Sequence, residues 1–131
     1  MERTNVSTGT VWEERVGYCR VVRVGPFVYA AGTLCTDDDG EMVHPHSAYL
    51  QTLGALEKIE RSMKKAGASR ADVVRTRMYI LHLRDQEDVG RAHKEFFGQV
   101  LPVSTMIEVK GLAAPTALVE IEVDAVLAGG A

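Results

Sequence analysis

The sequence predicts an α+β domain with the element order β-β-α-β-α-β-β and one mixed sheet that carries two helices on one face. Two amphipathic helical stripes and several segments of alternating polarity indicate this order. Because two helices cover only one face of such a sheet, the other face needs a partner. A second copy of the chain is the obvious candidate, although the residues expected on that face are a mixture of polar and apolar types.

A β-hairpin is predicted near the N-terminus. Residues 20–24 alternate charged and apolar side chains, as a half-buried strand does. The turn signal Gly25-Pro26 separates them from residues 27–31, Phe-Val-Tyr-Ala-Ala, which predict a second and more buried strand. Gly32 follows, at a position suited to backbone freedom or close approach.

Two helices are predicted from apolar residues that recur every three or four positions. The first stripe consists of Tyr49, Leu53, Leu56, Ile59, Met63 and Ala66. Pro45 suits its first turn, and Gly67 suits the position just past its end. The second stripe consists of Val89, Ala92, His93, Phe96, Phe97 and Val100. Asp85 is expected to cap this second helix, with Asp88 completing a partial capping box.

Three further strands are predicted. Residues 73–81 form the first, with Val74, Thr76, Met78 and Ile80 on one face and Arg75, Arg77 and Tyr79 on the other. A short strand follows, in which the apolar alternation runs through Thr105, Ile107 and Val109. Residues 118–127 form the last and longest strand, with one apolar face and one face that carries Glu120, Glu122 and Asp124.

Composition narrows the class of protein. The length of 131 residues suits a single domain spanning residues 1–131. The net charge is -3 and no basic cluster exceeds Lys64-Lys65, which argues against a nucleic-acid partner. No apolar run approaches the roughly 20 residues of a membrane helix, and the first residues lack the order of a signal peptide. These features predict a cytoplasmic protein with no membrane partner.

The three carboxylates of the last strand have two interpretations. In the functional one, Glu120 is a general base or holds a water, with a pKa raised by burial. In the other, all three form a solvated face or pair with Arg75 and Arg77 across the sheet. The pattern alone favours the second interpretation.

The cysteines and histidines give weaker signals. Cys35 follows the second strand, but a nucleophilic thiol needs a base or a cationic environment. No paired histidine is evident, so Cys35 and Cys19 are expected to be buried and to pack as small apolar side chains. The pair His44 and His46 lacks a third ligand, and no metal site is predicted. No Walker loop or dinucleotide fingerprint occurs, so no cofactor is expected.

An ordered set of short stretches resembles the RidA/YjgF family over nearly the whole chain. No stretch is specific alone, but their order and spacing are. The matching stretches are Gly17-Tyr18, Gly32 after residues 27–31, Ala66-Gly67-Ala68, Asp72-Val73-Val74-Arg75-Thr76, Phe96-Phe97, Pro102, Glu108-Val109 and Val119-Glu120-Ile121-Glu122.

The resemblance implies a homotrimer whose sheets form a central barrel, with helices outside and a pocket at each subunit interface. The family's best-known activity is hydrolysis of reactive imines and enamines released by pyridoxal-phosphate enzymes. It yields a 2-keto acid and ammonia, and needs no metal or cofactor. In that mechanism an arginine holds the substrate carboxylate through a bidentate fork, while a glutamate and backbone groups help to place a water.

The family's site residues are only half matched here. Tyr18, Gly32 and Glu120 are retained, and the resemblance makes Glu120 the catalytic candidate. It also implies a ligand pocket lined by Tyr18, Gly32, Thr33, Cys35, Ser104 and Thr105. Ser104 stands where the family has its arginine, Ala31 replaces a pocket serine, and Met106 replaces a frequent cysteine.

The missing arginine bears directly on activity. Serine cannot neutralise a carboxylate or make the two-pronged contact. Deaminase activity on 2-imino acids is therefore not expected unless Arg20, Arg75 or Arg77 supplies the charge from elsewhere.

Three functions remain open. The leading hypothesis is a divergent RidA-like protein that binds a small metabolite between subunits and can hydrolyse an imine, an enamine or a related electrophile. The alternative is a ligand-binding or regulatory module of the same fold without chemistry. A ribonuclease, an activity reported for some relatives, agrees least with the acidic charge balance.

Overall fold

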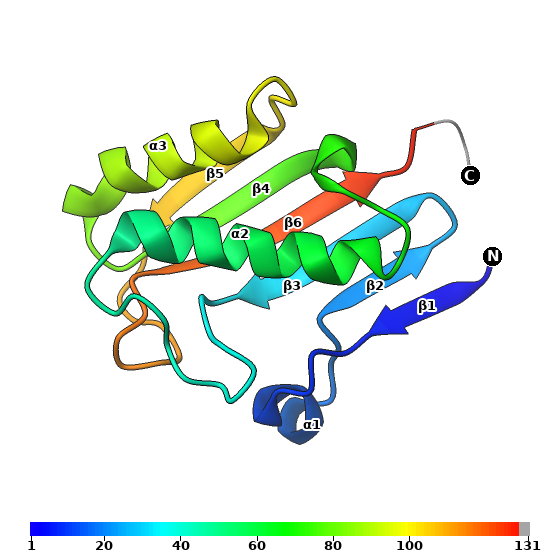
Figure 1. The fold of residues 1–131 in the computed structure, drawn as a ribbon, viewed down its shortest axis with the longest axis horizontal. Coiled ribbons are helices and arrows are strands. Elements are labelled where there is room, and N and C mark those ends of the chain that lie inside the picture. The colour runs from blue at the N-terminus through cyan, green and yellow to red at the C-terminus, as the bar shows by residue number, and fades with distance from the viewer. Residues whose placement is uncertain (129–131) are drawn as a thin grey trace.

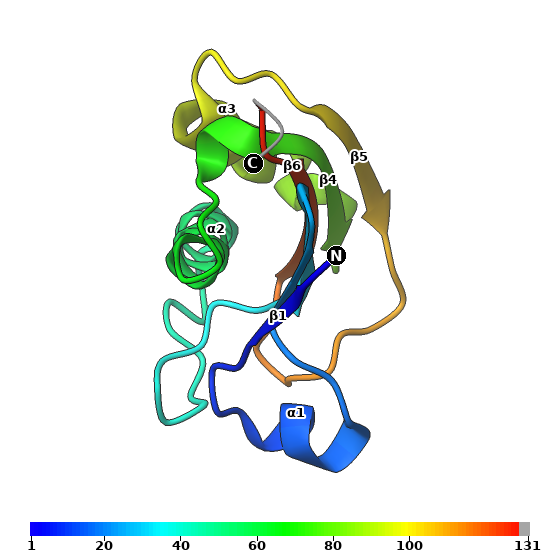
Figure 2. The same ribbon diagram turned by 90° about the vertical axis from the view of Figure 1, so that its right-hand side faces the viewer.

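The computed structural model describes residues 1–128, which form a six-stranded sheet with two long helices on one face (Figures 1 and 2). In spatial order the strands are β1 (Arg3–Val6), β2 (Val21–Val24), β3 (Phe27–Thr33), β6 (Val119–Val126), β4 (Val73–Ile80) and β5 (Val103–Glu108). Only the β4–β5 pair is parallel, so the sheet is mixed. The predicted α+β class is confirmed.

The helices α2 (Ala48–Lys64) and α3 (Gln86–Phe97) cover one face of the sheet, and Figure 2 shows the opposite face open. Short 3₁₀ turns, η1 (Arg70–Asp72) and η2 (Leu83–Asp85), precede β4 and α3. The core lies between sheet and helices, where Leu56 and Ile59 of α2 pack with Val28 and Ile121 at no more than 1% exposure.

The N-terminal part contains two elements that the sequence analysis missed. The strand β1 adds an edge beside β2, and the helix α1 (Val11–Val16) follows it. Both are short and mostly exposed, so neither shows a hydrophobic period. A readable signal for α1 was present, because Thr10 and Glu13 form a full capping box.

The expected helix starts need correction. Ser47 is the N-cap of α2 and accepts a hydrogen bond from the Leu50 N–H at 3.0 Å, so Pro45 lies outside the first turn. Asp85 occupies the N-cap position of α3 but makes no capping hydrogen bond, because η2 leads directly into that helix. The expected capping box with Asp88 is therefore wrong. Gly67 does lie just past α2, with a φ of 88°.

The expected faces of β4 and the expected end of β5 also need correction. Val74 is 45% exposed, because β4 carries an extra residue between the pairs Val73–Ala125 and Arg75–Asp124. Such a bulge interrupts the alternation of side chains between the two faces. Val109 lies beyond the end of β5 at Glu108.

The open face of the sheet mixes polar and apolar side chains, as the sequence predicted. Tyr29 of β3 and Ile107 of β5 are each 50% exposed there, alongside the charged residues of β4 and β6. Among residues 1–128, no helix has both the length and the apolar composition that crossing a membrane requires.

Candidate functional site

A cavity of about 470 Å³ opens at one end of the sheet, between α1, the chain that leaves β3, and the loop before β6. Figure 1 shows these three segments gathered at the same end of the molecule. Its lining includes three residues that the resemblance singled out, namely Tyr18, Gly32 and Glu120. It also includes two cationic residues, Arg20 and Lys58. The volume is within the usual range for small-molecule sites.

Glu120 is the carboxylate that β6 presents to this cavity. It is half-buried, and none of the residues that the structure describes hydrogen-bonds to it or pairs with it. Burial raises the pKa of Glu120, while the nearby Arg20 charge acts against the rise and Glu122 adds to it. Gly32 lies against this carboxylate, since a Cβ at that position would stand 2.7 Å from Oε1.

The other two carboxylates of β6 are in a different situation. The Tyr79 hydroxyl donates to Glu122 at 2.6 Å, and Arg77 lies 3.7 Å from the same oxygen. Asp124 pairs with Arg77 at 3.3 Å and with Arg75 at 3.7 Å. The expected pairing across the sheet is therefore confirmed for Glu122 and Asp124, and Glu120 stands apart from both.

Arg20 is the arginine that reaches the cavity, and it is 4% exposed. Its Nη1 donates to the Gly32 carbonyl at 2.8 Å and to Thr33 Oγ1 at 3.2 Å, and its Nη2 lies 3.5 Å from Glu13. These contacts fix the guanidinium and occupy much of its donor fork. The same guanidinium stands 5.7 Å from the centre of the Tyr18 ring, within range of a cation–π interaction.

Glu13 of α1 anchors this wall of the cavity and was missed by the sequence analysis. Burial alone would raise the pKa of Glu13, but hydrogen bonds from the side chains and N–H groups of Thr8 and Thr10 outweigh it and lower the pKa to about 2. The two hydroxyls donate at 2.6 Å and 2.7 Å. Glu13 thereby ties the segment before α1 to Arg20.

Lys58 of α2 is the second cation of the cavity, and the sequence did not reveal it. It is 8% exposed, and its Nζ donates to Thr36 Oγ1 at 2.7 Å. Burial lowers the pKa of Lys58, and the Arg20 charge lowers it further. Lys58 is not part of the apolar stripe of α2, and the residue before it, Glu57, is exposed, so the helical pattern gave no sign that Lys58 is buried.

Four of the expected pocket residues lie outside this cavity in the single chain. Thr33 is fully buried and donates to the Ala31 carbonyl at 2.7 Å. Cys35 is buried and borders a different hollow, beside α2. Ser104 and Thr105 lie on β5 at the far edge of the sheet. Their contribution to a pocket across a subunit interface stays a prediction.

Ser104 makes a contact that the sequence did not suggest. Its hydroxyl accepts a hydrogen bond from Thr76 Oγ1 at 2.7 Å, and Thr76 also lies 2.8 Å from His93 Nε2. This chain of contacts runs from β5 through β4 to α3, on the helix side of the sheet. Within the residues described, no group of three or more His, Cys, Asp and Glu side chains is placed to bind a metal ion.

The two thiols are expected to differ in reactivity. Cys35 is 6% exposed, and its pKa is raised by burial and by the charge of Glu57. Cys19 is more accessible. Because the thiolate is the reactive form, iodoacetamide should modify Cys19 about tenfold faster or more at pH 8. Peptide mass mapping over time measures both rates, and equal rates in the folded protein would contradict the burial of Cys35.

One protein-family model and several known proteins match the sequence of this chain. The family model described as Endoribonuclease L-PSP matches residues 11–127. An uncharacterized protein from Streptomyces coelicolor is 39% identical over 121 residues, which are 92% of this chain and 89% of that protein. The 3-aminoacrylate deaminase RutC from Acinetobacter baylyi is 30% identical over 104 residues, which are 79% and 82% of the two chains.

A solved structure of similar sequence agrees with the family match. The crystal structure of a YjgF/YER057c/UK114 family member from Mycobacterium tuberculosis superposes with a TM-score of 0.87 at 44% identity. The match covers 96% of this chain and 100% of that chain.

Proposed function

Because the chain belongs to the Endoribonuclease L-PSP family, which is the RidA/YjgF family, we propose that it binds a small metabolite in the cavity at Glu120 and hydrolyses a reactive imine or enamine there. The observation that carries this proposal is the unpaired state of Glu120. The other two carboxylates of β6, Glu122 and Asp124, pair with arginine. Glu120 has no such partner among the described residues, faces the cavity, and has a raised pKa. Unpaired carboxylates with perturbed pKa values in clefts are typical of functional sites.

In the proposed reaction, Glu120 acts as a general base toward a water held in the cavity. The carboxylate takes a proton as the water oxygen attacks the carbon of the protonated C=N bond, which gives a neutral carbinolamine. Glu120 then returns that proton to the nitrogen, and ammonia leaves as the hydroxyl group loses its own proton to solvent and becomes the carbonyl. The net reaction adds one water and releases one ammonia, and no cofactor is needed.

The proposed assembly is a homotrimer in the cytoplasm. Support comes from the open face of the sheet, which leaves Val103 at 59% and Ile107 at 50% exposure along the edge strand β5. Burial of these side chains in a subunit contact would be favourable. A neighbouring subunit would then bring its own β5, with Ser104 and Thr105, to the interface pocket. Light scattering after gel filtration should give three times the chain mass of 14.3 kDa, and the mass of a single chain would contradict the trimer.

The experiment for the proposed activity follows imine decay. An amino-acid oxidase generates 2-imino acids in situ, and 3-aminoacrylate is tested in parallel because one relative carries that activity in its name. The expected result is decay of at least one of these compounds faster than in buffer, in proportion to the protein concentration. A protein that binds small ligands but accelerates no decay would instead be the binding module without chemistry.

A further inference from the structure

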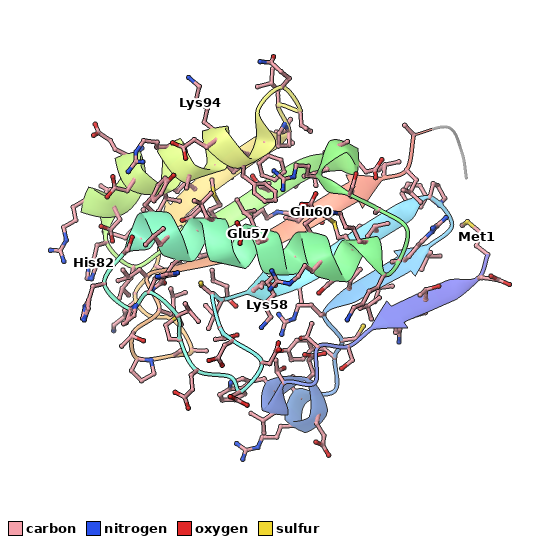
Figure 3. The ribbon with its side chains drawn as sticks, viewed as in Figure 1. Met1, Glu57, Lys58, Glu60, His82 and Lys94 are labelled. Atoms are coloured by element: carbon pink, nitrogen blue, oxygen red, sulfur yellow. The ribbon has the colours of Figure 1, made fainter. Side chains whose placement is uncertain are left out.

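Lys58 is a buried cation whose surroundings lack a matching anion. Its side chain extends from α2 toward the side of the molecule where α1 lies, and it lines the cavity at 8% exposure (Figure 3). The Nζ has one hydrogen-bond partner among residues 1–128, the Thr36 hydroxyl at 2.7 Å. No carboxylate oxygen of these residues lies within the 4.0 Å of a salt bridge. Buried charges are normally paired, because leaving water costs them much free energy.

The charged groups around Lys58 do not neutralise it at close range. Arg20 and Arg61 repel its ammonium, while Glu13 and Asp38 attract it without reaching salt-bridge distance. Glu13 already accepts hydrogen bonds from Ser7, Thr8 and Thr10 and pairs with Arg20. The inner wall of the cavity therefore has a cation with unused donors.

We propose that Lys58 binds the carboxylate group of a small organic acid inside this cavity. A lysine ammonium has three donors, and Thr36 uses one of them. The Thr36 hydroxyl accepts from Lys58 and can turn its own proton toward the same carboxylate. Arg20 is less suited to this role, because Gly32, Thr33 and Glu13 already hold its guanidinium.

This assignment deepens the proposed function and rests on the same cavity being the ligand site. Ser104 has no charge to offer a carboxylate, and Lys58 supplies that charge from a different element, α2. Glu120 and Lys58 line the same cavity. A small acid held at Lys58 would therefore keep its other end in the space that Glu120 also borders.

A second hollow next to Lys58 provides the control. It is lined by Thr8, Thr36, Asp37, Asp38, Lys58, Arg61, Ser62 and Lys65. Lys65 is exposed and borders this outer hollow but not the cavity at Glu120. An anion that binds outside would depend on Lys65, and an anion that binds in the cavity would not.

The test measures ligand binding rather than turnover. Pyruvate, 2-oxobutyrate and benzoate are titrated by calorimetry or NMR, each beside its methyl ester, which carries one more methyl group and no charge. In the wild type, at least one acid should bind more tightly than its ester. Lys58→Met should weaken that acid about 10- to 100-fold, as expected for loss of a hydrogen bond to a charged group, and should leave the ester unchanged.

Two further variants secure the interpretation. Lys58→Arg keeps the charge and should retain more of the binding than Lys58→Met, while Lys65→Met should change the affinity by less than about twofold, as an exposed charge does. The proposal is overturned if no acid binds better than its ester, if Lys58→Met binds as well as the wild type, or if Lys65→Met has the same effect. Lys58-dependent binding without imine decay would uphold this inference and refute only the proposed hydrolysis.

Discussion

Glu13→Gln is expected to lower the free energy of unfolding by about 3 kcal/mol at pH 7, on the scale of 1.36 kcal/mol for each pKa unit. The native pKa of Glu13 is about 2, against an ordinary value of 4.5. A glutamine has one acceptor oxygen, and its amide group would face the donors that Thr8 and Thr10 direct at the carboxylate. Because Glu13 is 5% exposed, water cannot replace these hydrogen bonds.

The sign of the pH dependence follows from the lowered pKa. The stabilisation by Glu13 is complete above pH 4.5 and is lost as the pH falls through the native pKa of about 2. Urea denaturation at pH 7 and at pH 2.5 should therefore show a large difference between wild type and Glu13→Gln at pH 7, and a smaller one at pH 2.5. Glu14→Gln, at an exposed position of the same helix, is the matched control. An equal loss in both variants would contradict the role of Glu13.

Gly32→Ala is expected to reduce the proposed activity by about 100-fold, the scale on which a displacement of 1 Å affects a catalytic group. The new Cβ would stand 2.7 Å from Oε1 and 3.1 Å from Cδ of Glu120, so the carboxylate must move away. The backbone of Gly32 is not in the left-handed region that favours glycine, and the fold should tolerate alanine.

The control for this substitution is Gly90→Ala. Gly90 lies in α3, and a Cβ there would meet no atom within 4 Å. Imine decay should proceed at the wild-type rate in Gly90→Ala and slow sharply in Gly32→Ala. A Gly32→Ala protein with full activity would show that catalysis does not require the observed position of the Glu120 carboxylate.

Much of this fold could be predicted from the sequence, because its main elements have clear periods. The stripe through Leu56 and Met63 gave α2, and the alternation through Ile121 and Val123 gave β6. The strand β1 and the helix α1 escaped notice because they are too short and exposed to show a period. The bulge after Val73 depends on how β4 pairs with β6, which no local pattern records.

The cavity could be predicted only in part. Pairing of β3 with β6, including Thr33 opposite Ile121, brings Gly32 close to Glu120 across a long stretch of chain. The resemblance to relatives supplied those two residues. Glu13 and Lys58 could not be found in this way, since burial of a charged side chain depends on which segments fold over it.

Burial of Glu120 has a consequence for stability. Its pKa is raised in the native state, so its contribution to stability is present below the ordinary pKa of 4.5 and is lost as the pH rises through the native value. Above the native pKa the charged side chain therefore destabilises the fold. Glu120→Gln should accordingly be at least as stable as the wild type, and a loss of activity in this variant would not come from unfolding.

The most direct test of Glu120 as the general base compares the rates of imine decay with wild type, Glu120→Gln and Glu122→Gln under identical conditions. Glu122 is the matched control because it lies on the same face of β6 but pairs with Tyr79 and Arg77. We expect Glu120→Gln to lose about 10²- to 10⁴-fold in rate, the usual contribution of a general base, while Glu122→Gln stays within a few-fold of the wild type. An active wild type whose rate survives Glu120→Gln would contradict the role of Glu120 in hydrolysis.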